Sequence, residues 1–257
     1  MSLFKSLALA IACFTHLPAP RVDWDSENMR FMMMWFPFVG LIVGAFVALW
    51  LFVSDAVGFG NVLRAVGVTL VPLAVTGGFH LDGFMDVVDA QMSHAEPEKK
   101  RAILKDSHIG AFAAMTVAAY LLLYFGIATE LPAGWRVMAL LACLPVMSRC
   151  GSGFATTVFW GNGHAGTLTM FRDSADVRAT VAVLVASFVV AAGVAIAIAP
   201  AVGLVMVAAE VLLLVWLNWF AQKNFGGMSG DVAGFFLQLC ELVLLACVVL
   251  VAKVAGL

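Results

Sequence analysis

The run ATVAVLVASFVVAAGVAIAIA, residues 179–199, contains no charged side chain and decides the fold class of this chain. A helix rises 1.5 Å per residue, and about 20 apolar residues suffice to cross the hydrocarbon core of a bilayer. The run therefore predicts a transmembrane helix, because the interior of a soluble domain would be accompanied by a charged shell.

The composition extends this conclusion to the whole chain. Of the 257 residues, 63% are hydrophobic and 12% charged, against roughly 45–50% apolar residues in soluble domains. The net charge of −2 and the scattered basic residues argue against a nucleic-acid-binding protein. Five cysteines without a C-x-x-C pair indicate neither a zinc site nor a disulfide framework.

Six further runs are long enough to span a membrane, so we predict an all-α, polytopic bundle of about seven transmembrane helices in a single domain, residues 1–257. The fourth is the least regular, since Arg149 interrupts it and Gly151 and Gly153 could break it. A short interfacial or half-buried helix, ended by Pro18 and Pro20, is expected before the first span. The predicted spans are Phe31–Val53, Asn61–Phe79, Gly110–Ala128, Val137–Phe159, Ala179–Ala199, Ala201–Ala221 and Val232–Val251.

The distribution of basic residues predicts the orientation. With seven spans, eleven of the 14 lysines and arginines fall on the side of the N-terminus. The positive-inside rule then places the N-terminus in the cytoplasm and the C-terminus outside. Most carboxylates and all five histidines fall on or near the same side, so we expect binding and chemistry at the cytoplasmic face.

The most acidic segment is GGFHLDGFMDVVDA, residues 77–90. If the second span continues past Phe79 as a helix, Asp82, Asp86 and Asp89 lie within about 60° of one another on one face. Three carboxylates at that spacing repel one another unless a cation lies between them. Oxygen ligands favour Mg²⁺, Mn²⁺ or Ca²⁺, and Mg²⁺ commonly binds substrate phosphates as well. The alternative is that these aspartates only solvate the end of a helix.

Further carboxylates occur in or beside the later spans. Asp231, at the start of the last span, is either an N-cap or a metal ligand. Glu241, inside that span, must face protein or water, because a carboxylate is costly in lipid. For Glu210 we expect a polar partner on a neighbouring helix.

Positive charge for an anionic substrate is available at several places. The run EPEKKR, residues 96–101, is expected to be a solvated loop. Arg149 is a candidate for phosphate contact, because its planar guanidinium matches phosphate oxygens, although anchoring at the membrane interface explains it equally well. The basic candidates are Lys99, Lys100, Arg101, Lys105, Arg149 and Arg172.

Several motifs together resemble the cobalamin synthase family, the adenosylcobinamide-GDP ribazoletransferases. They are FTHLPAP (14–20), FPFVGLIVG (36–44), GGFHLDGFMDVVDA (77–90), KDSHIGAFA (105–113), Ser148-Arg149 and GDVAGFFLQLCEL (230–242). The resemblance runs in order over nearly the whole chain. It departs from the family pattern at His16 and His108, where arginine is usual, at Ala90 and Ala113, where glycine is usual, and at Gln238, where glutamate is common.

The resemblance implies an enzyme that joins adenosylcobinamide-GDP to α-ribazole or its phosphate, with release of GMP and with Mg²⁺ as cofactor. It also implies a multi-pass protein of the bacterial cytoplasmic (inner) membrane, in contact with the lipid bilayer. Other enzymes of nucleotide-loop assembly are candidate partners, and the oligomeric state is left open. The candidate catalytic residues are His80, Asp82, Asp86, Asp89 and Asp106; the candidate substrate or phosphate ligands are Lys105, His108, Arg149 and Glu241; and the candidate metal ligands are Asp82, Asp86, Asp89 and Asp231.

Two other classes of function remain open from the residues alone. A cation-coupled transporter would use the same carboxylates to bind its ion, and would show uptake without nucleotide release. A non-catalytic membrane scaffold would tolerate Asp82→Ala and Asp86→Ala.

Overall fold

The computed structural model describes residues 2–106, 108–159, 161 and 174–255, and this part of the chain is almost entirely helical. Its only β pairing is an isolated bridge between Gly161 and Met228. The elements in order are α1 (Ser2–Phe14), α2 (Ser26–Met29), the 3-10 helix η1 (Met32–Trp35), α3 (Phe36–Val57), α4 (Asn61–Thr76), α5 (Phe79–Met92), α6 (Pro97–Ile103), α7 (Ala111–Thr129), α8 (Trp135–Val158), α10 (Val177–Ile198), α11 (Pro200–Phe225) and α12 (Gly230–Ala255).

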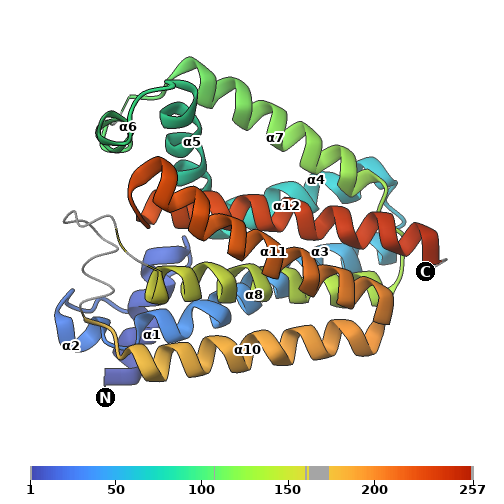
Figure 1. Ribbon diagram of the computed structural model, residues 1–257. Helices are drawn as coiled ribbons and strands as arrows, with labels where there is room; N and C mark the ends of the chain where they lie inside the picture. Colours follow the sequence, from blue (N-terminus) through green and yellow to red (C-terminus); the bar gives the residue numbers. More distant parts are fainter. Residues whose placement is uncertain (1, 107, 160, 162–173, 256–257) are drawn as a thin grey trace.

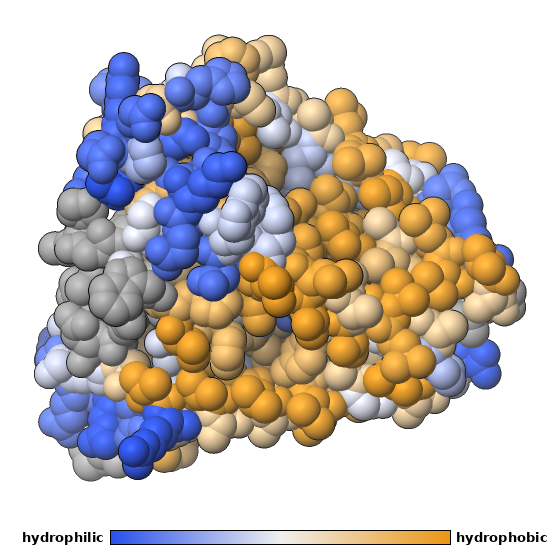
Figure 2. Space-filling model, viewed as in Figure 1, coloured by the Kyte–Doolittle hydropathy of each residue, from blue (hydrophilic) through white to orange (hydrophobic). Residues whose placement is uncertain are grey.

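The long helices run back and forth along one axis, and the two chain ends lie at opposite ends of the bundle (Figure 1). Six helices of the described residues are long and apolar enough to cross a membrane. Hydrophilic residues gather at the two ends, with an apolar belt between them (Figure 2). The prediction of a polytopic helical membrane bundle is thereby confirmed.

Helix α8 is the central helix of this bundle. Of its most apolar 18-residue window, 67% is buried inside the protein, compared with 22% for α10. The expected break in α8 is wrong, because the helix continues through Arg149, Gly151 and Gly153 to Val158. Its glycines accommodate neighbouring side chains instead: a Cβ at Gly151 would lie 2.7 Å from Glu210 Oε1, and one at Gly153 would lie 3.1 Å from Leu184.

The second predicted span does not continue straight past Phe79. Gly77 and Gly78 have φ values of +64° and +75°, which glycine adopts at little cost, and the chain turns by 96° between α4 and α5. Helix α4 has only 16 residues, and α5 lies across the end of the bundle where the N-terminus also lies (Figure 1). We therefore treat α5 as lying outside the membrane-spanning helices.

The N-terminal segment forms the expected short helix. Helix α1 has 13 residues, about 20 Å at 1.5 Å per residue, which is too short to cross the hydrocarbon core. Its residues Leu9, Ala10 and Phe14 are buried in a small apolar cluster that includes Phe36 at the start of α3. Helix α1 thus packs beside the same end of the bundle as α5 (Figure 1).

Candidate active site

The site is organised by the close crossing of α5 over the start of α12. A Cβ added at Gly83 would lie 2.9 Å from the Cα of Asp231, and one added at Gly234 would lie 3.0 Å from the carbonyl oxygen of His80. Each position therefore requires glycine, because a larger residue would separate the two helices. The crossing brings the acidic face of α5 beside Asp231, which lies about 150 residues later in the sequence.

Asp82, Asp86 and Asp231 form an acidic group at this crossing. Asp82 is exposed, while Asp86 and Asp231 are partly buried. Burial, followed by the charges of Asp82, Asp231 and Asp89 in that order of importance, together raise the pKa of Asp86 to about 7. The crossing thus brings a carboxylate from a distant part of the sequence beside the two on α5.

Asp89 has a different environment from Asp82, Asp86 and Asp231. Its Oδ2 accepts a hydrogen bond from the main-chain N–H of Gly110 at 2.6 Å, and its Oδ1 accepts one from Ala113 N–H at 2.8 Å. These N–H groups belong to the N-terminus of α7, where a carboxylate is favoured by the helix dipole. Asp89 therefore fixes the start of α7 against α5, and its side chain is oriented by that helix.

The donors at the crossing suit a hard divalent cation chemically, because all of them are carboxylate oxygens. In the described residues, however, no three His, Cys, Asp or Glu side chains already converge on one point as a metal site requires. The side chains of Asp82, Asp86 and Asp231 would have to change rotamer to bind a common ion.

His80 begins the same helix but is buried, with 4% of its surface exposed. Its ring lies among Phe14, Phe36 and Phe79, with centroid distances between 5.3 and 5.9 Å. Neither ring nitrogen has a hydrogen-bond partner among the described residues. Burial, and secondarily the charge of Arg149, hold the pKa of His80 well below its usual value, so the imidazole is neutral.

His80 also borders a cavity of about 50 Å³ that the sequence did not suggest. Ser152 and Thr156 of α8, together with Gly230 of α12, line the same cavity. In the sequence, these two hydroxyl residues lie four positions apart in the stretch SGFATT (152–157). That spacing is the signal by which a polar face on this helix could have been predicted.

The other candidates from the KDSHIGAFA motif are on the surface. Asp106 accepts a hydrogen bond from the main-chain N–H of His108 at 3.0 Å, and its Oδ1 lies 2.6 Å from His108 Nδ1. The contacts with His108 lower the pKa of Asp106. Lys105 is exposed. Asp106 is not among the charges that act on Asp86, so it stands apart from the acidic group.

Arg149 and Glu241 bind each other inside the bundle. Arg149 Nη1 lies 2.7 Å from Glu241 Oε1, and the two side chains are 1% and 4% exposed. The guanidinium also donates to the carbonyl of Pro145 at 3.1 Å, and Ser148 Oγ donates to Glu241 at 3.2 Å. This placement does not support the expected contact of either residue with a substrate phosphate, because their charges are directed at each other.

We expected the EPEKKR segment to be a solvated loop, and the structure shows that part of it is buried against a neighbouring helix instead. Lys100 is buried and donates to Gln91 and, at 3.0 Å, to Asn224. Arg101 donates to the carbonyl of Phe225 at 3.2 Å. The segment therefore attaches α6 to the end of α11. Arg172 lies outside the described residues.

Comparison with known proteins gives a consistent result along the chain. Residues 6–249 match the family model described as Cobalamin-5-phosphate synthase. A protein of Lachnoclostridium phytofermentans, named adenosylcobinamide-GDP ribazoletransferase, is 31% identical over 94% of this chain and 92% of its own length. A protein of the same name from Clostridium perfringens is 33% identical, over 93% of this chain and 94% of its own length. No solved structure matches the chain. With the family model covering nearly all of the sequence, the chain belongs to the cobalamin-5-phosphate synthase family.

Proposed function

We propose that this protein joins adenosylcobinamide-GDP to α-ribazole and releases GMP, at the end of the bundle where α5 crosses α12. The family membership and the names of the relatives support the reaction. The observation that supports the location is the meeting of Asp82 and Asp86 with Asp231 across the Gly83 and Gly234 contact. Neither a transporter nor a non-catalytic scaffold agrees with membership of a family whose named relatives are transferases.

In the proposed reaction, a hydroxyl oxygen of α-ribazole bonds to the cobinamide-linked phosphorus, the bond from that phosphorus to GMP breaks, and the hydroxyl proton passes to a base. Asp82, Asp86 and Asp231 would hold Mg²⁺, which supplies positive charge for the pyrophosphate. Asp89 orients α7 against α5 and so keeps the acidic face in position. His80 has no hydrogen-bond partner among the described residues and is one candidate for this base, beside the carboxylates of the acidic group.

We further propose that the acidic end faces the cytoplasm of a bacterial inner membrane. The same end carries the segment 96–105 with Lys99, Lys100, Arg101 and Lys105, and positive charge favours the cytoplasmic side. A water-soluble nucleotide substrate would then reach the site directly from the cytoplasm.

The experiment is a reconstitution of the purified protein in lipid nanodiscs with adenosylcobinamide-GDP, α-ribazole and Mg²⁺, followed by chromatography of GMP. Asp86→Asn and Asp231→Asn should each lower GMP release by at least about 100-fold, since each removes a charge from the pyrophosphate site. Asp23→Asn is the matched control, because Asp23 is exposed and its charge is not among those that act on Asp86.

Absence of GMP from the wild-type protein would reject the reaction. Full activity of both site variants would leave the reaction standing and reject the location. Activity that persists in EDTA would reject only the requirement for a divalent cation.

A further inference from the structure

Glu210 of α11 lies in the middle of a membrane-spanning helix, about 15 Å along the axis from Pro200. It is 2% exposed. The polar side chain expected as a partner on a neighbouring helix is not there: no side chain of the described residues donates a hydrogen bond to either carboxyl oxygen, and the polar group that acts on the carboxyl is the main-chain N–H of Gly151. A carboxyl group buried in this way is costly unless something satisfies it.

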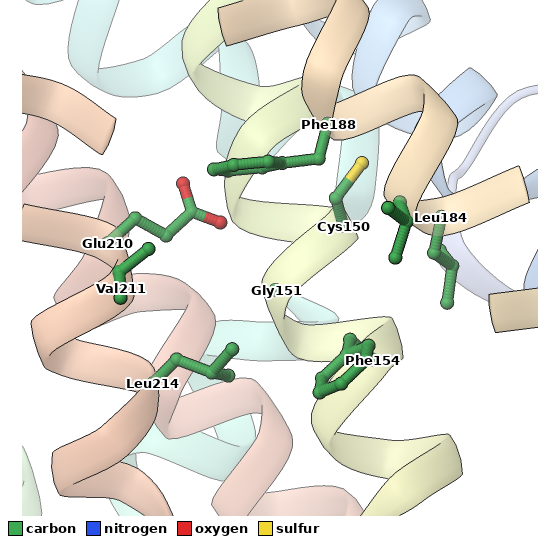
Figure 3. A pocket seen from close by; sticks show the side chains of 9 residues that line it. Cys150, Gly151, Phe154, Leu184, Phe188, Glu210, Val211 and Leu214 are labelled. Carbon is green, nitrogen blue, oxygen red and sulfur yellow. The ribbon is translucent and has the colours of Figure 1, made fainter. Parts of the chain in front are cut away.

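The carboxyl group borders a pocket between α8, α10 and α11. The pocket has a volume of about 160 Å³, close to the roughly 150 Å³ of an engineered cavity that binds benzene. Apart from Glu210 its walls are apolar, and Figure 3 shows the carboxyl pointing from α11 toward Phe188 and Cys150. The lining residues are Cys150, Gly151, Phe154, Leu184, Val185, Phe188, Glu210, Val211 and Leu214.

The pocket opens sideways, toward the position of the lipid chains. Val185 and Val211, on its two sides, are 46% and 49% exposed. They belong to α10 and α11, which run through the apolar surface between the two hydrophilic ends of the bundle (Figures 1 and 2). An apolar molecule dissolved in the bilayer can therefore reach the pocket without crossing either polar end.

The acidic group at the α5 crossing does not include this carboxyl. Asp86 responds to the charges of Asp82, Asp231 and Asp89, but not to that of Glu210. The proposed reaction assigns Glu210 no role.

We propose that this pocket is a binding site for a small, mainly aromatic or apolar molecule that carries one hydrogen-bond donor and enters from the bilayer. Phe154 and Phe188 provide contact for a ring, and Glu210 accepts the hydrogen bond. In an apolar site a single well-placed acceptor selects strongly between ligands that have the donor and ligands that lack it. The occupant would bridge α8, α10 and α11.

The first test asks whether an apolar molecule reaches Glu210 from the bilayer. The probe is dicyclohexylcarbodiimide, applied to the full chain in nanodiscs, with mass spectrometry of the peptides. The acid proton of a reactive carboxyl moves to a carbodiimide nitrogen, the carboxyl oxygen bonds to the central carbon, and the adduct rearranges to an acylurea with nothing lost. Glu210 should be modified, whereas Glu241, equally buried but paired with Arg149, should not.

The second test measures selectivity with two probes of equal shape, indole and indene, which differ in having an N–H or a CH₂ group. At equal concentrations in the bilayer, indole should slow the modification of Glu210 at roughly fivefold lower concentration than indene, the effect of one net hydrogen bond. Thermal unfolding should show the same preference as a larger rise in midpoint with indole.

Two variants separate the contributions of the carboxyl and of the cavity. Glu210→Met should bind both probes with equal affinity, measured by the rise in unfolding midpoint. Leu214→Trp, which fills the cavity, should lose the response to both while keeping Glu210 in place. An unmodified Glu210, equal protection by the two probes, or a preference for indole that survives in Glu210→Met would each overturn the proposal. None of these readouts depends on GMP release.

Discussion

The buried pair of Arg149 and Glu241 provides a prediction that decides between a structural and a substrate-binding role. At 2.7 Å, two unit charges attract by about 6 kcal/mol at an effective dielectric constant of 20. Desolvation of both groups opposes much of this attraction, so the intact pair contributes little net stability. Removing one partner, however, leaves the other charge buried and unpaired.

We therefore expect Glu241→Gln and Arg149→Met each to lower the free energy of unfolding by about 3–5 kcal/mol. The double variant should lie within about 2 kcal/mol of the wild type, because no charge then remains unpaired. The non-additivity should be at least about 3 kcal/mol. The measurement is reversible unfolding in mixed micelles by increasing mole fraction of dodecyl sulfate.

A matched control is the ion pair of Glu130 and Lys253, whose side chains are 55% and 50% exposed. Its cycle, Glu130→Gln with Lys253→Met, should show a coupling below about 1 kcal/mol, as is usual for surface pairs. A coupling this small for Arg149 and Glu241, together with lost GMP release in each stable single variant, would refute the structural role and restore direct contact with substrate.

Three further predictions concern the α5 crossing. Asp89→Ala should destabilise the start of α7 by about 1–2 kcal/mol, because two N–H groups lose their acceptor, and amide exchange at residues 110–113 should accelerate by roughly tenfold. Gly83→Val should abolish GMP release by pushing Asp231 away, whereas Gly193→Ala, which meets no atom within 4 Å, should keep full activity. Without divalent cations, Asp86→Asn should raise the unfolding midpoint at pH 8, and the gain should shrink as the pH falls toward 4. The reason is that the folded-state pKa of about 7 exceeds the ordinary 3.8, so the wild-type stability falls as the pH rises between these values.

Each of these predictions has a clear contrary result. Unchanged exchange in Asp89→Ala would show that the cap is not formed. An active Gly83→Val would show that close contact of α5 and α12 is dispensable. A stabilisation by Asp86→Asn that is equal at pH 4 and pH 8 would exclude charge repulsion as its cause.

The positions of the spans could be predicted because they depend on local sequence. A backbone in lipid must satisfy its own hydrogen bonds, so an apolar run of sufficient length becomes a helix whatever its neighbours are. The predicted span Ala179–Ala199 corresponds to α10, Val177–Ile198, and Val232–Val251 lies within α12, Gly230–Ala255. The bend after Thr76 was missed because two consecutive glycines permit a reversal without requiring one.

The acidic face of α5 could also be predicted, since i, i+4 and i+7 spacing is a property of one helix. The role of Asp89 could not, because its partners are main-chain N–H groups of α7, more than 20 residues away. The same holds for Lys100, whose partner Asn224 lies on α11. Such contacts depend on which helix ends meet.

The sequence by itself determined a helical membrane protein of this family, the positions of its spans and one face of carboxylates, because apolar length and helical spacing act within a single segment. Only the tertiary structure decided that Asp231 joins that face, that Arg149 binds Glu241, and that Glu210 faces an open apolar pocket. These outcomes depend on how closely pairs of helices approach. That distance is set jointly by small residues such as Gly83, Gly151 and Gly234 on one helix and by the side chains of another.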